Sequence, residues 1–167
     1  FIPEPAANAL TSHLFKETDQ GLGASEHKLF PDENFQKREF LCSTDERFRP
    51  VNVYSGPDGC IYVVDLYRGI LQHKVYVTGF YLKPYILERK LEVPVGMGRI
   101  YRIIHRGKGR DKTQPRLLSA SITELVKTLS HPNGWWRDIA QRLLVQRNDT
   151  KSVPLLKKTV ATAGNHL

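Results

Sequence analysis

The chain has 167 residues, of which 40% are hydrophobic and 25% are charged. These fractions are close to globular averages and exclude a wholly disordered protein. No apolar run approaches the roughly 18 residues that are needed to cross a bilayer. The first residues lack the basic and apolar regions of a signal peptide, and the chain does not begin with Met. We therefore expect it to be a segment of a longer protein.

The net charge of +8 is divided unevenly along the chain. Residues 1–100 carry 12 Lys/Arg and 13 Asp/Glu, a balance of −1, whereas residues 101–167 carry 13 and 4, a balance of +9. Such a division predicts two modules, or one module with a basic tail. Most of the excess lies between Arg102 and Arg116, and we interpret residues 107–117 as a solvated basic linker. This reading argues against a nucleic-acid partner and leaves a basic nucleic-acid module as a minor alternative.

The first hundred residues have the pattern of β-structure. Two β-rich runs, 51–54 and 60–65, flank the sequence Gly56-Pro57-Asp58-Gly59. Its Pro at the second position and Gly at the fourth are typical of a tight type I turn, so the two runs predict a hairpin. A further strand is expected at 98–104, where side chains alternate between two faces.

Four-stranded sheets separated by turns of this kind are typical of β-propeller blades. We therefore expect residues 1–106 to be the last blades of a β-propeller, with inserted irregular loops at about 19–38 and 71–94. A hundred residues supply about two blades, whereas a propeller needs roughly 4–8 to close. The rest of the propeller is expected from the remainder of the same protein or from a neighbouring chain.

From residue 118 onward the period changes to that of a helix. Ser121 and Glu124 form a capping-box pattern near the start of the first helix, and residues 131–134 stop it. The apolar residues of this helix are spaced by three and four and predict one buried face: Leu118, Ile122, Leu125, Val126 and Leu129.

Two further helices are expected after the first. The second carries Trp135 and Trp136, of which one must point inward because consecutive helical positions face different ways. The third opens near Pro154. Short antiparallel helices with tight turns are typical of HEAT repeats, so residues 118–167 are expected to begin a HEAT-like α-solenoid that needs further repeats beside it. The fold class predicted for the whole chain is thus a β-propeller segment followed by an α-helical HEAT-like repeat.

The two cysteines, Cys42 and Cys60, are too few for a disulfide framework. Cys60 lies in an apolar strand pattern, and we expect it to be a buried free thiol. A single bridge between the two stays open as the alternative if the protein is exported.

The run from Arg47 to Arg68 resembles the last blades of glucose/sorbosone dehydrogenase-like propellers. It is most similar to the membrane-bound dehydrogenase proteins of the Planctomycetes–Verrucomicrobia type, in which a Gly-Arg-Ile-Tyr-Arg-Ile strand, here 98–103, leads into HEAT repeats. His131-Pro132-Asn133, continuing to Leu144, resembles the first of these repeats. The resemblance implies export to the periplasm or secretion, a sugar-like substrate and a cytochrome c electron acceptor.

The resemblance also implies a pyrroloquinoline quinone cofactor and calcium. Arg47 and Arg49 match an Arg-x-Arg-x-Val pattern whose arginines contact the carboxylates of the quinone in related proteins. A planar guanidinium suits this task because it binds a carboxylate through two parallel hydrogen bonds and keeps its charge. The alternative is that either arginine pairs with Asp45 or Glu46, or closes a contact between blades. The catalytic base and the calcium loop of the relatives would lie outside this segment.

Three further residues are candidates for the substrate or the propeller channel. Asp65 ends a predicted strand, where it either faces the channel to bind a metal or sugar hydroxyl, or accepts backbone N–H bonds in the turn that follows. Tyr67 is a candidate for stacking on a sugar, and Arg68 for pairing with Asp65 or reaching the channel mouth. No metal ligand is assigned.

Two functions follow from these observations. The first is a segment of a quinoprotein-like sugar or alcohol dehydrogenase, an oxidoreductase that passes electrons to a cytochrome c. The alternative is a non-catalytic propeller and HEAT scaffold that binds carbohydrate or protein, because a fold does not determine the chemistry that it hosts.

Overall fold

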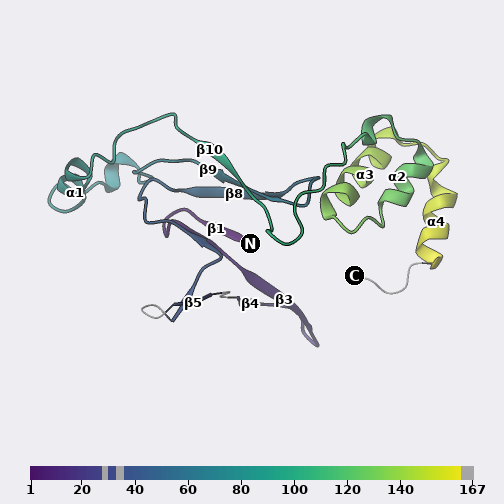
Figure 1. Cartoon of the computed structure of the whole chain (residues 1–167), viewed down its shortest axis with the longest axis horizontal. Helices are drawn as coiled ribbons and strands as arrows, with labels where there is room; N and C mark the ends of the chain where they lie inside the picture. Colours follow the sequence, from purple (N-terminus) through teal and green to yellow (C-terminus); the bar gives the residue numbers. More distant parts are fainter. Residues whose placement is uncertain (28–29, 33–35, 163–167) are drawn as a thin grey trace. The chain divides into compact units, whose positions relative to one another are not determined.

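The computed structural model describes residues 1–27, 30–32 and 36–162 (Figure 1). The chain divides into two compact units. Unit 1 comprises Phe1–Tyr54 and Ile61–Ile103, and unit 2 comprises Ser55–Cys60 with the chain from Ile104 onward. Among the described residues no helix has the length and apolar character that spanning a membrane requires.

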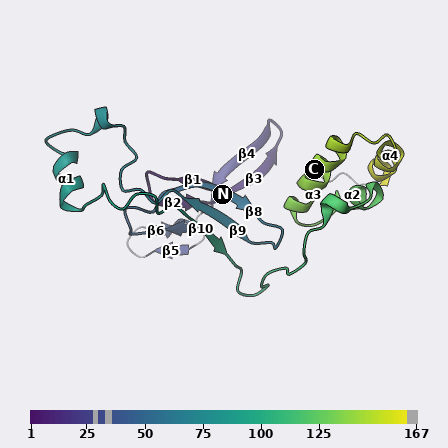
Figure 2. The same ribbon diagram turned by 90° about the horizontal axis from the view of Figure 1, so that it is seen from above.

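Unit 1 is built from short strands. They form two three-stranded sheets, ordered β1-β2-β7 and β10-β9-β8, and two separate hairpins, β3-β4 and β5-β6 (Figure 2). The bounds of the strands are β1 Ile2–Glu4, β2 Ala9–Thr11, β3 His13–Thr18, β4 Gly21–Glu26, β5 Phe30–Asp32, β6 Gln36–Arg38, β7 Leu41–Cys42, β8 Pro50–Ser55, β9 Ile61–Asp65 and β10 Arg99–Ile103.

This arrangement contradicts the predicted β-propeller. The described strands form no four-stranded blade, because the β3-β4 and β5-β6 hairpins pair only within themselves. Three of these strands lie in residues 19–38, which were expected to be an irregular loop. The turn signal identified the β8–β9 hairpin correctly, and β10 lies where a strand was predicted. A local turn, however, does not determine how many strands a sheet gathers.

The connection between β9 and β10, residues 66–98, is called the arm below. It contains a 3₁₀ turn, η1 Lys74–Tyr76, and a helix, α1 Leu82–Glu88, where the sequence suggested only a loop. Figures 1 and 2 show α1 beyond the ends of the strands that the arm connects. Among the described residues of the arm, Leu91 alone is a buried large apolar side chain.

Unit 2 is helical from residue 117 onward. It contains the 3₁₀ turn η2 Leu117–Ser119 and the helices α2 Ile122–Thr128, α3 Gly134–Arg147 and α4 Ser152–Thr162. The predicted capping box of α2 is confirmed, since Ser121 accepts from the N–H of Glu124 and the Glu124 carboxylate accepts from the N–H of Ser121. The helix-opening position of Pro154 is confirmed as well.

The predicted HEAT-like repeat is wrong. The described helices form one cluster in which the seven-residue α2 contacts both α3 and α4, and no pair of helices is repeated. The apolar spacing identified the buried residues of α2 and α3, whereas α4 has no buried residue, and an apolar face does not by itself specify a repeat. The core of the cluster consists of Leu117, Leu125, Val126, Trp136, Ala140, Leu143 and Leu144.

Leu118 does not belong to the buried face that was predicted for it. Its side chain is 83% exposed, and Leu117 is buried instead. The reason is that η2 and the extended backbone of Ala120 interrupt the helix before α2, so the helical phase cannot be extrapolated backward to residue 118. Trp136 is the buried member of the tryptophan pair, and Cys60 is a buried free thiol, as predicted.

The turn at residues 56–59 contacts the start of α3 within unit 2. The Asn133 side-chain amide donates to the carbonyls of Gly56 and Pro57 at 2.9 and 3.3 Å, and the Trp136 indole N–H donates to Pro57 at 2.9 Å. The Asn133 side-chain oxygen also accepts from the N–H of Trp135 and so caps the helix. One asparagine therefore both starts α3 and binds the turn.

We predict that Asn133→Asp destabilises unit 2 by about 1–2 kcal/mol, because it removes a half-buried amide donor and keeps the helix cap. Urea unfolding followed by tryptophan fluorescence measures this loss, since both tryptophans lie in α3. Asn52→Asp, the same change at an exposed position of β8, is the control. An equal midpoint for Asn133→Asp and wild type contradicts the role of the amide.

Candidate functional site

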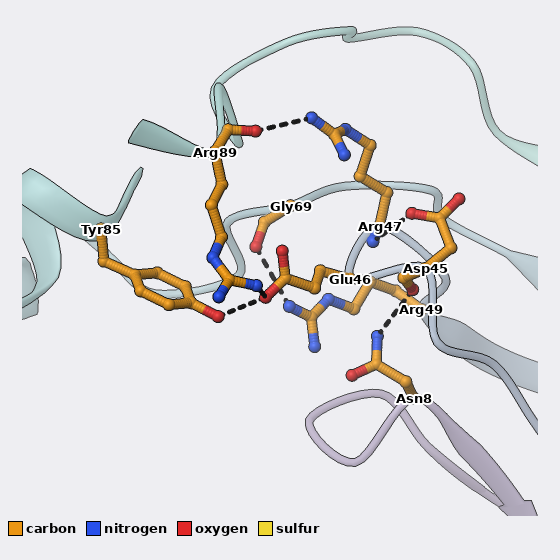
Figure 3. Close-up of polar contacts among 8 residues, drawn as sticks. All are labelled: Asn8, Asp45, Glu46, Arg47, Arg49, Gly69, Tyr85 and Arg89. Atoms are coloured by element: carbon orange, nitrogen blue, oxygen red, sulfur yellow. Dashed lines mark hydrogen bonds and ion pairs between the residues drawn. The ribbon is translucent and has the colours of Figure 1, made fainter. Parts of the chain in front are cut away.

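The candidate site of unit 1 lies on the segment between β7 and β8. It carries Asp45, Glu46, Arg47 and Arg49, and Figure 3 shows their polar contacts. Asn8 fixes this segment from the β1–β2 turn, where its φ of 54° places it in the left-handed region. Its side-chain amide donates to the carbonyls of Asp45 at 3.3 Å and Phe48 at 2.6 Å.

The Arg47 guanidinium is bound to backbone carbonyls of the arm. Its Nε donates to Val93 at 3.0 Å, and one terminal nitrogen donates to Arg89 at 3.1 Å and Lys90 at 2.9 Å. The carbonyls of Arg89 and Lys90 directly follow α1, which ends at Glu88, and the carbonyl of Val93 lies three residues beyond Lys90. Arg47 therefore holds the returning half of the arm.

The Arg49 guanidinium binds carbonyls from two other segments. It donates to Arg68 and Gly69 at 3.0 Å each, at the start of the arm, and to Pro5 at 2.8 Å and Ala6 at 3.4 Å, in the β1–β2 turn. Burial lowers the pKa of Arg49, and the nearby Glu46 and Tyr85 act in the opposite direction. An arginine keeps its charge despite such a shift, so these contacts are charge-assisted.

Glu46 contacts the arm from the same segment. Its carboxylate accepts a short hydrogen bond from the Tyr85 hydroxyl and forms an ion pair with Arg89 at 2.8 Å. The hydrogen bond to Glu46 is the largest cause of the raised pKa of Tyr85. Because the Arg89 side chain is half-exposed, we attach little stability to this ion pair.

Gly69 lets the two halves of the arm approach each other. A Cβ at this position would lie 2.4 Å from the carbonyl oxygen of Leu91, a contact that backbone atoms cannot tolerate. Arg49 binds the Gly69 carbonyl, and Arg47 binds the carbonyl just before Leu91. Together, Glu46, Arg47 and Arg49 hold the base of the arm closed, and we call these three residues the clamp.

Asp65 joins the clamp to the sheet. Its side chain is 1% exposed, and Oδ1 accepts from the N–H groups of Arg49 and Tyr67 at 2.8 Å each. The second alternative raised for Asp65, acceptance of backbone N–H bonds, is thus present in the structure. Its Oδ2 is buried and has no hydrogen-bond partner among the described residues.

Tyr67 and Arg68 do not share one environment. Tyr67 has a φ of 49°, donates its hydroxyl to Asp45 at 2.9 Å and lies 3.7 Å beneath the Arg99 guanidinium. The Arg68 side chain is exposed, and its described contact is its backbone carbonyl, which Arg49 binds. The structure therefore brings Arg49, Asp65 and Tyr67 together and leaves the Arg68 side chain in solvent.

Sequence reasoning missed the partners of these residues. Asn8, Gly69, Tyr85 and Arg89 belong to no local motif, and their contacts join positions up to 43 residues apart, as for Arg89 with Glu46. The only local signal is Gly69, a glycine just beyond a strand end, which is compatible with close backbone approach.

The implied quinone can be compared with this geometry. The Arg47 and Arg49 guanidiniums already donate six hydrogen bonds of 3.1 Å or less to backbone carbonyls. A carboxylate of the quinone would have to displace these carbonyls. The guanidiniums as placed do not fit a quinone carboxylate. For calcium, the described residues contain no group of three or more His, Cys, Asp or Glu side chains that could hold a metal ion.

Comparison with known proteins places the site within one protein family. The sequence model of a family described as a domain of unknown function, DUF7133, matches residues 1–107, which is more than half of the chain. The matched region includes the clamp and the whole arm. No curated protein matches the chain, and no solved structure matches it either.

We predict that Arg49→Ala speeds chymotryptic cleavage after Tyr85 by about tenfold, because loss of partly buried, charge-assisted hydrogen bonds raises the population of the open arm. Arg47→Ala produces a smaller increase, since its contacts are more exposed. Arg68→Ala is the matched control, because its side chain takes no part in the clamp. Equal cleavage rates for Arg49→Ala and Arg68→Ala contradict the assignment.

We also predict that Asp45 makes the free energy of unfolding of unit 1 depend on pH. The N–H of Arg47, followed by the Tyr67 hydroxyl and the charges of Arg47 and Arg99, lowers the pKa of Asp45 below its ordinary value of 3.8, despite an opposing effect of burial. A lowered folded-state pKa stabilises the protein above pH 3.8, and this stability is lost as the pH falls through the folded pKa.

Asp45→Asn removes this dependence. Urea unfolding, followed by the amide NMR signals of unit 1, should show wild type more stable than Asp45→Asn at neutral pH and the difference shrinking as the pH falls below 3.8. A difference that stays constant across this range would show that the Asp45 charge does not stabilise the site.

Proposed function

The chain belongs to the DUF7133 family, and we propose that its unit 1 is a protein-recognition module that presents the arm to a partner protein. The observation that carries this proposal is the contrast between the base of the arm and its surface. At the base, the clamp engages backbone carbonyls and side chains of the arm. On the surface, large apolar side chains lie in solvent.

The arm exposes several large apolar side chains. Phe80 is 90% exposed, and several other apolar residues of the arm are more than half exposed: Val75, Tyr76, Tyr81, Leu87, Val95 and Met97. Exposed apolar side chains that gather on one segment are typical of interaction surfaces. Aromatic residues in particular supply much of the binding energy of protein interfaces.

A protein partner fits these residues better than a carbohydrate does. Sugar rings stack on aromatic faces, whereas the arm mixes its aromatic residues with Val75, Val95 and Met97, which offer no such face. The arm also carries five Lys or Arg and two Glu, a formal charge of +3. A partner surface with an apolar pocket and acidic residues around it would match both features.

The clamp gives the arm the rigidity that recognition benefits from. A free connection of this length would lose conformational entropy on binding, and a segment that is already held in shape avoids part of this cost. In this interpretation Arg47 and Arg49 act as positioning residues for the arm. The quinoprotein function stays a prediction that the titration below tests.

We predict that a photoreactive phenylalanine analogue at position 80 crosslinks to one discrete protein in an extract of the source cells. Excess wild-type chain should compete, whereas the chain with Tyr76→Ser, Phe80→Ser and Tyr81→Ser should not. Val145→Ser, a change at an exposed apolar residue of α3, should compete like wild type. The purified partner should bind wild type at least about tenfold more tightly than the triple variant, as expected for aromatic anchors.

Two outcomes contradict the proposal. One is equal competition by wild type and the triple variant, or no protein adduct at position 80. The other is calorimetric binding of pyrroloquinoline quinone to the full chain that Arg47→Ala and Arg49→Ala abolish, because it would assign the arginines to a cofactor.

A further inference from the structure

A groove in unit 2 combines apolar side chains with unengaged positive charge. It lies between η2 and the first turns of α3 and has a volume of about 480 Å³. Cavities of this size are within the range that binds small ligands or a few side chains of a peptide. Its lining includes Leu118, Trp135 and Ile139, with Arg116 and Arg142 beside them.

The η2 wall of the groove is fixed by Arg147. The guanidinium of Arg147 donates to the carbonyl of Leu118 at 2.7 Å, to that of Leu117 at 3.3 Å, and to that of Ala120. Leu117 is also buried in the helical core. The wall is therefore formed before any ligand arrives, which reduces the ordering cost of binding.

The apolar part of the groove is accessible to a ligand. Leu118 is 83% exposed, although it follows a buried leucine directly. Trp135 and Ile139 are half-buried and lie one turn apart on α3. The Trp135 ring packs edge-on against Trp136 at 5.6 Å between ring centres, so its position is set by the core.

The charges of the groove have no partner of their own. Within the part of the chain that the structure describes, neither the Arg116 nor the Arg142 guanidinium has a hydrogen bond or ion pair, and both residues are exposed. Two unengaged guanidiniums beside an apolar surface therefore favour an acidic ligand.

We propose that this groove binds an acidic, apolar segment of a partner protein, in which a leucine or phenylalanine side chain lies next to a carboxylate. The apolar side chain would rest against Leu118, Trp135 and Ile139, and the carboxylates would pair with Arg116 and Arg142. A nucleic acid matches the charge but not the aliphatic residues, which do not stack on bases. The inference concerns unit 2 and does not rest on the function proposed for the arm.

The test uses the full chain and two short synthetic peptides that each contain two leucines. Glutamates flank the leucines in the first peptide, and glutamines flank them in the second. Calorimetry and tryptophan fluorescence should detect binding of the glutamate peptide and a change in the Trp135 environment. Arg116→Gln with Arg142→Gln should weaken this binding by about tenfold, from the loss of two exposed ion pairs. Arg110→Gln with Lys112→Gln removes the same charge outside the groove and should leave the affinity within about twofold of wild type.

A third variant separates the apolar contact from the charges. Leu118→Ser should also weaken binding of the glutamate peptide. Because Leu118 is exposed, this change should leave the midpoint of urea unfolding unchanged. The Phe80→Ser variant of the arm should bind the peptide like wild type, so failure of the arm proposal leaves this result intact.

Several results would overturn the inference. The first is the absence of binding of the glutamate peptide. The second is equal affinity for the glutamine peptide. The third is an equal loss of affinity in the control variant with changes at 110 and 112. Self-association of the chain that the changes at 116 and 142 abolish would assign the groove to a second copy instead. Tighter binding to single-stranded RNA than to the peptide, lost in the same variant, would assign it to nucleic acid.

Discussion

Unit 1 depends on arginine side chains that bind backbone carbonyls. A long connection between neighbouring strands must satisfy its own polar groups and pay the entropy of being ordered. Among its described residues the arm buries one large apolar side chain, Leu91, which is too little for this purpose. Arg47 and Arg49 bind the carbonyls at its two ends, and Gly69 lets those ends meet.

The same principle recurs in unit 2 with different donors. The Arg147 guanidinium holds η2, and the Asn133 amide and the Trp136 indole hold the turn at residues 56–59. In each case a side-chain donor is directed at backbone carbonyls outside regular structure. Such contacts hold irregular segments in place without enlarging the core, and apolar residues such as Phe80 and Leu118 stay exposed.

The predictions from the sequence were correct where a feature depends on residues close together in the chain, and wrong where it depends on distant ones. The β8–β9 hairpin, the capping box of α2 and the burial of one of the two adjacent tryptophans depend on neighbours within a few residues, and all three were predicted correctly. The propeller and the HEAT repeat required assumptions about how distant elements associate, and both were wrong. Local patterns do not encode whether β3 and β4 join a larger sheet or pair alone.

In the candidate site, too, the sequence identified residues but not their distant partners. Arg47, Arg49, Asp65 and Tyr67 were singled out, and the structure brings the last three together, but their partners lie far away in sequence. Asn133 was interpreted as part of a helix stop and of the run that resembles a HEAT repeat, because nothing near it indicates a bond to a turn 76 or 77 residues earlier.

Side-chain ¹H–¹⁵N NMR measures directly whether the Arg47 and Arg49 guanidiniums are bound to backbone carbonyls. We expect the Nε–H groups of both arginines to exchange slowly with water, while that of Arg68 exchanges rapidly in the same spectrum. If the Nε–H of Arg49 exchanges as rapidly as that of Arg68, Arg49 does not hold the arm.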